Sequence, residues 1–186
     1  MKVINLFGGP GCGKSTMAAA VFTYMKFKGH NVELVTEYAK DLVWDNRLED
    51  MLDQQEYIFA KQNHRLHRLR DHVDYVVTDS PLLLSTIYPN ALTWPAYHEF
   101  CEFVRATNLT YTNMNFFLNR LGEEHFQEVG RAHNFAQSVD LDNQIRYMLT
   151  NDIRTPYIDI SAQSASIEDL METAEEIARL SINTSD

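Results

Sequence analysis

The sequence is poor in cysteine and has no long apolar run, and each shortage excludes a class of protein. Cys12 and Cys101 are its only cysteines, so a disulfide framework is excluded and we expect a reducing, cytoplasmic setting. No uninterrupted apolar stretch approaches the roughly 18 residues of a membrane span. The apolar residues 3–7 near the start are too short for the core of a signal peptide. We therefore expect a protein that does not enter a membrane.

Basic residues are also scarce. The chain has 16 Lys and Arg against 26 Asp and Glu, a formal net charge of −10, which disfavours holding nucleic acid by global attraction. Residues 159–186 carry seven acids and one base and so supply −6 of this charge. The rest of the chain is close to neutral for its length, and it remains compatible with a local basic groove.

The apolar residues that are present predict one folded α/β domain spanning 1–186. The chain is 45% hydrophobic, which excludes disorder. Short runs rich in β-branched and aromatic residues predict strands at residues 2–7, 31–36, 74–78, 110–118 and 156–160. Between them, the patterns predict helices at residues 14–28, 37–45, 48–72, 82–88, 94–106, 138–150 and 167–180. This alternation predicts a five-stranded parallel sheet with helices on both faces.

A phosphate-binding loop lies between the first strand and the first helix. Residues 8–15 read Gly-Gly-Pro-Gly-Cys-Gly-Lys-Ser and match GxxxxGK[ST] without a mismatch. In such a loop the backbone N–H groups surround phosphate oxygens, the lysine bridges the β- and γ-phosphates, and the hydroxyl ligates magnesium. We therefore expect a three-layer P-loop NTPase that binds a nucleoside triphosphate together with Mg²⁺. The expected nucleotide-binding residues are Gly9, Gly11, Cys12, Gly13, Lys14, Ser15 and Thr16.

The chain lacks the features of three classes of nucleotide-binding protein. No lysine follows Asn or Thr, so the guanine-binding Asn/Thr-Lys-x-Asp pattern of GTPases is missing, and the chain is too short for an AAA motor with its second helical domain. The dinucleotide pattern GxGxxG also fails, because Lys14 stands where the third glycine belongs. A small kinase remains, in which catalysis rests on positioning and on charge neutralisation.

Two acidic residues follow predicted strands and suit the roles that a kinase needs. Asp79 follows the third strand, where a carboxylate orients magnesium together with Ser15, although a helix cap is the alternative. Glu37 ends the second strand and is the candidate base for the acceptor hydroxyl. Capping of the next helix is the alternative for Glu37, and Asp41 is the fallback base.

The predicted helix at 48–72 carries the candidate acceptor site. Apolar residues recur along one stripe at alternating spacings of four and three, but Gln55 and Gln62 interrupt it beside Phe59. An amide offers a donor and an acceptor to a nucleobase edge, and Tyr38, Tyr57 or Phe59 could stack on the base. Bonding of either amide to backbone is the alternative.

The opposite face of the same helix is basic. It carries Lys61, Arg65, Arg68 and His72, which suit a phosphodiester backbone or simply form a solvated face. We include Arg65 among the acceptor-binding residues.

Residues 119–134 are polar and contain glycine, which predicts a lid after the fourth strand. Arginines in such a lid close over a triphosphate and exclude water. Arg120 and Arg131 are the candidates, with Arg146 behind them, and a surface arginine without function is the alternative for Arg131.

Together, these motifs resemble the AAA-like P-loop kinase group. The resemblance rests on residues 8–15, on Thr-Glu-Tyr-Ala-Lys at 36–40, on the Gln54-Gln55 helix, on Thr-Asp-Ser-Pro at 78–81 and on Gly-Arg at 130–131. The group includes ribosylnicotinamide kinases and many small phage kinases, and the chain looks most like the phage 5-hydroxymethyluridine DNA kinases. Residues 78–81 depart from the Thr-Asp-Thr-Asp-like pattern of ribosylnicotinamide kinases.

The resemblance implies an ATP- and Mg²⁺-dependent phosphotransferase located in a host cytoplasm if the chain is phage-encoded. The acceptor we expect is a hydroxyl of a pyrimidine nucleotide unit, with 5-hydroxymethyluracil in DNA as the first choice. A free nucleoside, a nucleoside monophosphate and ribosylnicotinamide are the alternative acceptors. From another class, a nucleotide-dependent binding or switch ATPase without an acceptor stays open.

Overall fold

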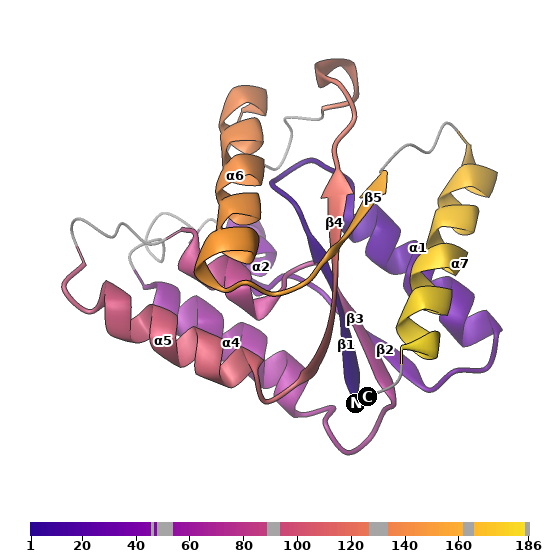
Figure 1. The fold of residues 1–186 in the computed structure, drawn as a ribbon, viewed down its shortest axis with the longest axis horizontal. Helices are drawn as coiled ribbons and strands as arrows, with labels where there is room; N and C mark the ends of the chain where they lie inside the picture. The colour runs from indigo at the N-terminus through magenta and orange to yellow at the C-terminus, as the bar shows by residue number, and fades with distance from the viewer. Residues whose placement is uncertain (46, 48–53, 89–93, 127–133, 162–165, 185–186) are drawn as a thin grey trace.

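The protein is built around one five-stranded parallel sheet (Figure 1). The computed structural model describes residues 1–45, 47, 54–88, 94–126, 134–161 and 166–184. The strands are β1 (Lys2–Phe7), β2 (Val32–Val35), β3 (Tyr75–Thr78), β4 (Thr112–Asn119) and β5 (Ile158–Ser161). Their order in space is β2-β3-β1-β4-β5, and all neighbouring pairs are parallel. The predicted five-stranded parallel sheet is confirmed.

Helices cover both faces of the sheet. The α-helices are α1 (Lys14–Phe27), α2 (Tyr38–Trp44), α4 (Gln55–His67), α5 (Tyr97–Asn108), α6 (Phe135–Tyr147) and α7 (Ile167–Asn183). Shorter helical turns are the 3₁₀ segments η1 (Leu82–Thr86) and η2 (Glu123–His125) and the π-helix η3 (Met148–Asp152). Figure 1 shows α1 and α7 together on one side, with α4, α5 and α6 on the other.

The alternation of side chains along the strands divides the core into two layers. On β1, Val3 and Phe7 point into one layer, whereas Ile4 and Leu6 point into the other. The first layer is rich in aromatic residues and is closed by α4, α5 and α6. The second layer is closed by α1 and α7, which pack on each other through alanine, methionine and aliphatic side chains. Because both faces are covered, the central strands β1 and β3 are mostly apolar rather than alternating.

Several helix boundaries differ from the predicted ones, each for a local reason. The segment after Pro81 was expected to be an α-helix to residue 88, but it forms the buried 3₁₀ turn η1, only five residues long. Helix α6 begins before the predicted residue 138, because Asn134 and Gln137 form a capping box that starts it at Phe135. The predicted helix at 48–72 is helical at Gln55–His67, and residues 48–53 lie outside the described residues.

None of the helices in the described part of the chain has the length and apolarity that a bilayer span requires.

Burial on the α7 face generates a stability prediction. Ile177 is fully buried between α7 and the sheet, whereas Ile167 on the same helix is 70% exposed. We expect Ile177→Ala to lower the free energy of unfolding by about 3 kcal/mol, through lost burial and the cavity left behind. Ile167→Ala should change it by about 0.5 kcal/mol or less. Urea unfolding followed by circular dichroism measures both, and equal effects of the two variants would contradict this packing.

Candidate functional site

Four strands end at one edge of the sheet and deliver the candidate residues to it. The phosphate-binding loop follows β1, Glu37 lies two residues beyond β2, Asp79 directly follows β3, and Arg120 directly follows β4. Since β1 is bonded to both β3 and β4, the loop lies between Asp79 and Arg120. This edge, at the carboxyl ends of parallel strands, is where open α/β sheets bind their ligands.

The loop adopts a conformation that requires glycine at three positions. Gly8, Gly11 and Gly13 have φ angles of 138°, 83° and 92°, in the region that residues with a side chain rarely adopt. Gly13 caps the start of α1, so the positive end of the helix dipole faces the loop. The Lys14 ammonium folds back over the loop and donates to the carbonyls of Gly8 and Gly9, at 2.6 and 2.9 Å. Ser15 and Thr16 follow in the first turn of α1 and are exposed.

Asp79 fits the magnesium role predicted for it. The residue is only 4% exposed, and its Oδ1 atom is buried without a hydrogen-bond partner. A buried carboxylate oxygen without a partner is costly unless a cation or donor joins it. No cluster of three or more His, Cys, Asp or Glu among the described residues could hold a metal alone. The arrangement therefore suits a hard cation held by the Asp79 carboxylate, the Ser15 hydroxyl and phosphate oxygens.

The Glu37 carboxyl lies close enough to Lys14 and Asp79 for their charges to affect its pKa. Glu37 is the N-cap residue of α2, yet its side chain makes no capping hydrogen bond, so it does not serve the alternative capping role. Burial raises the pKa of the Glu37 carboxyl; the Lys14 ammonium opposes this rise, the Asp79 carboxylate adds to it, and Lys40 opposes it. Asp41 instead forms an ion pair with Arg65 and has a half-exposed side chain. Of these two acids, Glu37 is the one that the charges of Lys14 and Asp79 affect.

A cavity opens on the other side of the loop. Its volume is about 150 Å³. The lining residues are Gly11, Cys12, Gly13, Thr16, Met17, Leu118, Arg120, Leu121, Gly122, Phe126, Phe135 and Leu170. The Arg120 guanidinium lies 5.7 Å from the centre of the Phe135 ring, and the Phe126 ring contacts Phe135 edge-on. The cavity is thus bounded by loop backbone, by a cation and by aromatic rings. Leu170 comes from the acidic helix α7.

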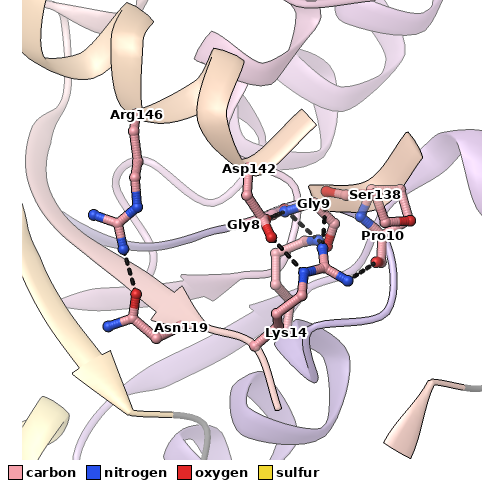
Figure 2. Close-up of polar contacts among 9 residues, drawn as sticks. Gly8, Gly9, Pro10, Lys14, Asn119, Ser138, Asp142 and Arg146 are labelled. Carbon is pink, nitrogen blue, oxygen red and sulfur yellow. Dashed lines mark hydrogen bonds and ion pairs between the residues drawn. The ribbon is translucent and has the colours of Figure 1, made fainter. Parts of the chain in front are cut away.

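Arg120 is already engaged with protein groups. Its Nε–H donates to Asp142, one terminal nitrogen donates to the Pro10 carbonyl at 3.2 Å, and the other donates to the Ser138 carbonyl at 3.0 Å. Figure 2 shows Asp142 and Ser138 of α6 facing the loop. Arg146, one turn further along α6, contacts Asn119 at the end of β4. Arg131, the second predicted lid arginine, lies outside the described residues.

On the Glu37 side, aromatic and basic side chains form an exposed cluster. The hydroxyls of Tyr38 and Tyr57 are 3.2 Å apart. The Arg65 guanidinium lies over the Tyr38 ring at 5.2 Å, and the Lys61 ammonium lies over the Tyr57 ring at 5.3 Å. We call Tyr38, Tyr57, Lys61 and Arg65 the tyrosine cluster. Two of the predicted acceptor residues, Tyr38 and Arg65, therefore lie together.

The other predicted acceptor residues face the protein. The Phe59 ring is 2% exposed and packs against Phe100 and Phe103, so it cannot stack on a base as we had predicted. The Gln62 amide bonds to backbone, the second of the two interpretations: its Oε1 accepts from the Tyr38 N–H at 2.9 Å and its Nε2 donates to the Thr36 carbonyl at 3.3 Å. Gln55 is buried at the start of α4.

Sequence reasoning missed Tyr88 and Asp142. Tyr88 is 37% exposed, yet desolvation of its hydroxyl raises the pKa, and the charges of Glu37 and Asp142 raise it further. In the sequence, Tyr88 is marked only as a tyrosine at the end of the apolar run that follows Asp79. Asp142 is buried on α6 and accepts a hydrogen bond from the Gly9 N–H. In the sequence, Asp142 is marked only as an acid four residues before Arg146. The contact between α6 and the loop is tertiary and leaves no local pattern in the sequence.

The raised pKa of Glu37 generates a prediction about stability and pH. The folded state holds the Glu37 proton more tightly than the unfolded state, so burial of the carboxylate costs stability as pH rises above the unfolded value of about 4.3. Glu37→Gln should therefore be more stable than wild type at pH 7, and this advantage should shrink as pH falls toward 4. Urea unfolding across this range measures it. The control is Glu172→Gln at an exposed position, whose stability relative to wild type should not change with pH in this way. A Glu37→Gln protein that is less stable than wild type at pH 7 would show that burial of the Glu37 carboxylate does not cost stability.

Comparison with solved structures shows the same fold in an enzyme. The deoxyadenosine kinase from M. mycoides with the products dCMP and a flexible dCDP bound has a TM-score of 0.62 and 15% sequence identity, covering 97% of this chain and 100% of that one. The same enzyme with bound dATP has a TM-score of 0.58 and 16% identity, covering 95% and 98%. These similarities support the three-layer P-loop NTPase fold. No curated protein matches this chain in sequence.

The family follows from the sequence as a whole. The model of the AAA domain family matches residues 3–169, which span all five strands, the phosphate-binding loop and the first residues of α7. The chain belongs to this AAA domain family.

Proposed function

We propose that the protein is a kinase that transfers the γ-phosphoryl group of ATP to a hydroxyl of a pyrimidine nucleotide unit. One observation carries the proposal. Glu37, Lys14 and Asp79 follow the ends of three different strands, and the charges of Lys14 and Asp79 act on the Glu37 carboxyl. A base, a phosphate-binding cation and a metal-orienting carboxylate are the parts that phosphoryl transfer needs. The likeness of the fold to a deoxyadenosine kinase supports the same reaction class.

The donor nucleotide belongs on the loop and in the cavity beside it. The loop amides and the end of α1 would receive the phosphates, and Lys14 would exchange its bonds to Gly8 and Gly9 for the β- and γ-phosphates. Ser15 and Asp79 would hold a magnesium ion, which supplies charge neutralisation at the phosphate oxygens. We place the ring of the base in the cavity beside the loop, where the aromatic rings of Phe126 and Phe135 offer stacking partners.

Glu37 would supply the proton transfer. Its carboxylate accepts the proton of the acceptor hydroxyl as that oxygen forms a bond to the γ-phosphorus. The bond between the γ-phosphorus and the bridging oxygen breaks, and ADP leaves with the bonding electrons. A raised pKa makes Glu37 a stronger base than an exposed glutamate, and the nearby Lys14 ammonium opposes that rise.

The acceptor would lie on the Glu37 side of the loop, against the tyrosine cluster. Exposed tyrosine rings stack on bases, and Lys61 and Arg65 attract phosphates. A base that carries its own hydroxyl, 5-hydroxymethyluracil within DNA, is the specific acceptor that we propose, in line with the resemblance to phage DNA kinases. The scarcity of basic residues elsewhere predicts weak, salt-sensitive binding to the polymer.

An acceptor panel tests this specificity. Labelled ATP is supplied with duplex DNA containing 5-hydroxymethyluracil, with unmodified DNA, with free nucleosides including ribosylnicotinamide, and with nucleoside monophosphates. We expect label only on the hydroxymethylated DNA. Label only on a free nucleoside or monophosphate would refute the polymer acceptor while keeping the kinase. ATP binding with no labelled product from any member would identify a nucleotide-dependent binding or switch protein.

Two variants separate the role of Glu37 from that of Lys14. Glu37→Gln should lower kcat by about 100-fold or more, the size of a lost general base, with ATP affinity close to wild type. Lys14→Ala should abolish transfer, because the γ-phosphoryl group loses its cation. Transfer rates with the accepted substrate and ATP binding by calorimetry measure both. A wild-type rate in Glu37→Gln would remove it as the base.

A further inference from the structure

Helix α6 contacts the phosphate-binding loop through one carboxylate. The two oxygens of Asp142 accept from the Gly9 N–H and from the Arg120 Nε–H. Both side chains are largely buried, with 12% of Asp142 and 11% of Arg120 exposed. Charge-assisted bonds of this kind are strong and directional when they are shielded from water. The carboxylate therefore ties the second residue of the loop to the residue that follows β4 (Figure 2).

Arg120 extends this contact to the next residue of the loop. One terminal nitrogen donates to the Pro10 carbonyl at 3.2 Å, and the other donates to the Ser138 carbonyl of α6 at 3.0 Å. Each of its three nitrogens thus has an acceptor on a different residue. We call Asp142 and Arg120 the loop clamp, because together they hold consecutive loop residues, Gly9 and Pro10, against α6.

The steric surroundings of Gly9 support the clamp independently. The phosphate-loop motif permits any residue at this position. A Cβ atom on Gly9 would lie 2.5 Å from the Ser138 carbonyl oxygen, 2.9 Å from an Arg120 nitrogen and 2.9 Å from an Asp142 oxygen. These distances are too short for a side chain. Glycine is therefore required here because α6 approaches the backbone closely.

Helix α6 is itself fixed one turn further along. Arg146 pairs with Asp159 of β5 at 2.7 Å and bonds to Asn119 at the end of β4. Its guanidinium also lies over the Phe117 ring at 3.8 Å. Since Asp142 and Arg146 are four residues apart, they share one face of α6. Asp142 thus belongs to a helix that is itself bonded to the ends of β4 and β5.

We propose that Asp142 is a positioning residue for ATP binding, which rests on the proposed function. It acts through Gly9 and Arg120 and does not touch the reacting atoms. By fixing the loop backbone before the nucleotide arrives, it removes the ordering cost that a loose loop would meet on binding the phosphates. Because Asp142 neutralises Arg120, the arginine holds the loop through the directions of its N–H donors rather than through its net charge.

The first test compares two Asp→Asn variants on the same helix. Asp142→Asn keeps an acceptor for Gly9 but presents an N–H to the Arg120 Nε–H, which breaks the pair. Calorimetric titration with ATP and Mg²⁺ should show roughly tenfold weaker binding, and KM for ATP should rise to match while KM for the acceptor stays within about twofold. The control is Asp140→Asn, an exposed residue that bonds only to Gln144 in the described structure, and it should bind ATP as the wild type does.

Two further variants test the geometry of the clamp. Arg120→Lys keeps the charge but cannot donate in three directions, so it should lose ATP affinity as Asp142→Asn does. The double variant should be no worse than either single one, because the two residues act as a unit. Gly9→Ala should show the same loss. Wild-type ATP affinity in Arg120→Lys, or additive losses in the double variant, would overturn the proposal.

Thermal unfolding of each variant separates positioning from mere stability, and titrations are run below every unfolding transition. If Asp142→Asn is less stable but its folded molecules bind ATP within about twofold of wild type, the positioning role is wrong. The proposed kinase activity fails separately: ATP binding by the wild type without transfer to any acceptor refutes the kinase and leaves the clamp measurable by titration. A wild type that does not bind ATP overturns both.

Discussion

The central position of β1 is the constraint on which the site depends. This strand is bonded to β3 on one side and to β4 on the other, and its faces are buried in two separate core layers. The loop that follows β1 therefore leaves the sheet from its central strand, with Asp79 on one flank and Arg120 on the other. Local glycine geometry shapes the loop, but the pairing of the sheet determines what the loop faces.

Acidic residues crowd a crevice that suits a polyanion. Glu37, Asp79 and Asp142 all lie near the loop, and each is compensated in a different way: Asp142 pairs with Arg120, Asp79 keeps a bare oxygen that suits a cation, and Glu37 responds with a raised pKa. Such an arrangement is unfavourable for folding alone, since buried carboxylates stabilise a protein only when they are paired. The proposed kinase function accounts for it, because catalytic sites commonly sacrifice stability for reactivity.

The sequence predicted the parts of the site that follow from strand ends, and it missed the parts that depend on how helices dock. The loop, Asp79 and Glu37 were found because each follows an apolar run, and parallel pairing brings such ends together. Gln62 was recognised as out of place on an apolar stripe, but the pattern does not say whether its amide meets a ligand or, as here, the backbone on both sides of Glu37. Asp142 could not be found, because nothing local marks a helix face that touches a distant loop.

The small side chains between α1 and α7 have a consequence for the cavity beside the loop. Ala174 and Ala178 are fully buried on the face of α7 that also carries Leu170, at intervals of four residues. Leu170 forms one wall of the cavity beside the loop, so the closeness that the alanines allow sets how far that wall stands from the loop. The width of the cavity is thus set in part by residues that do not line it.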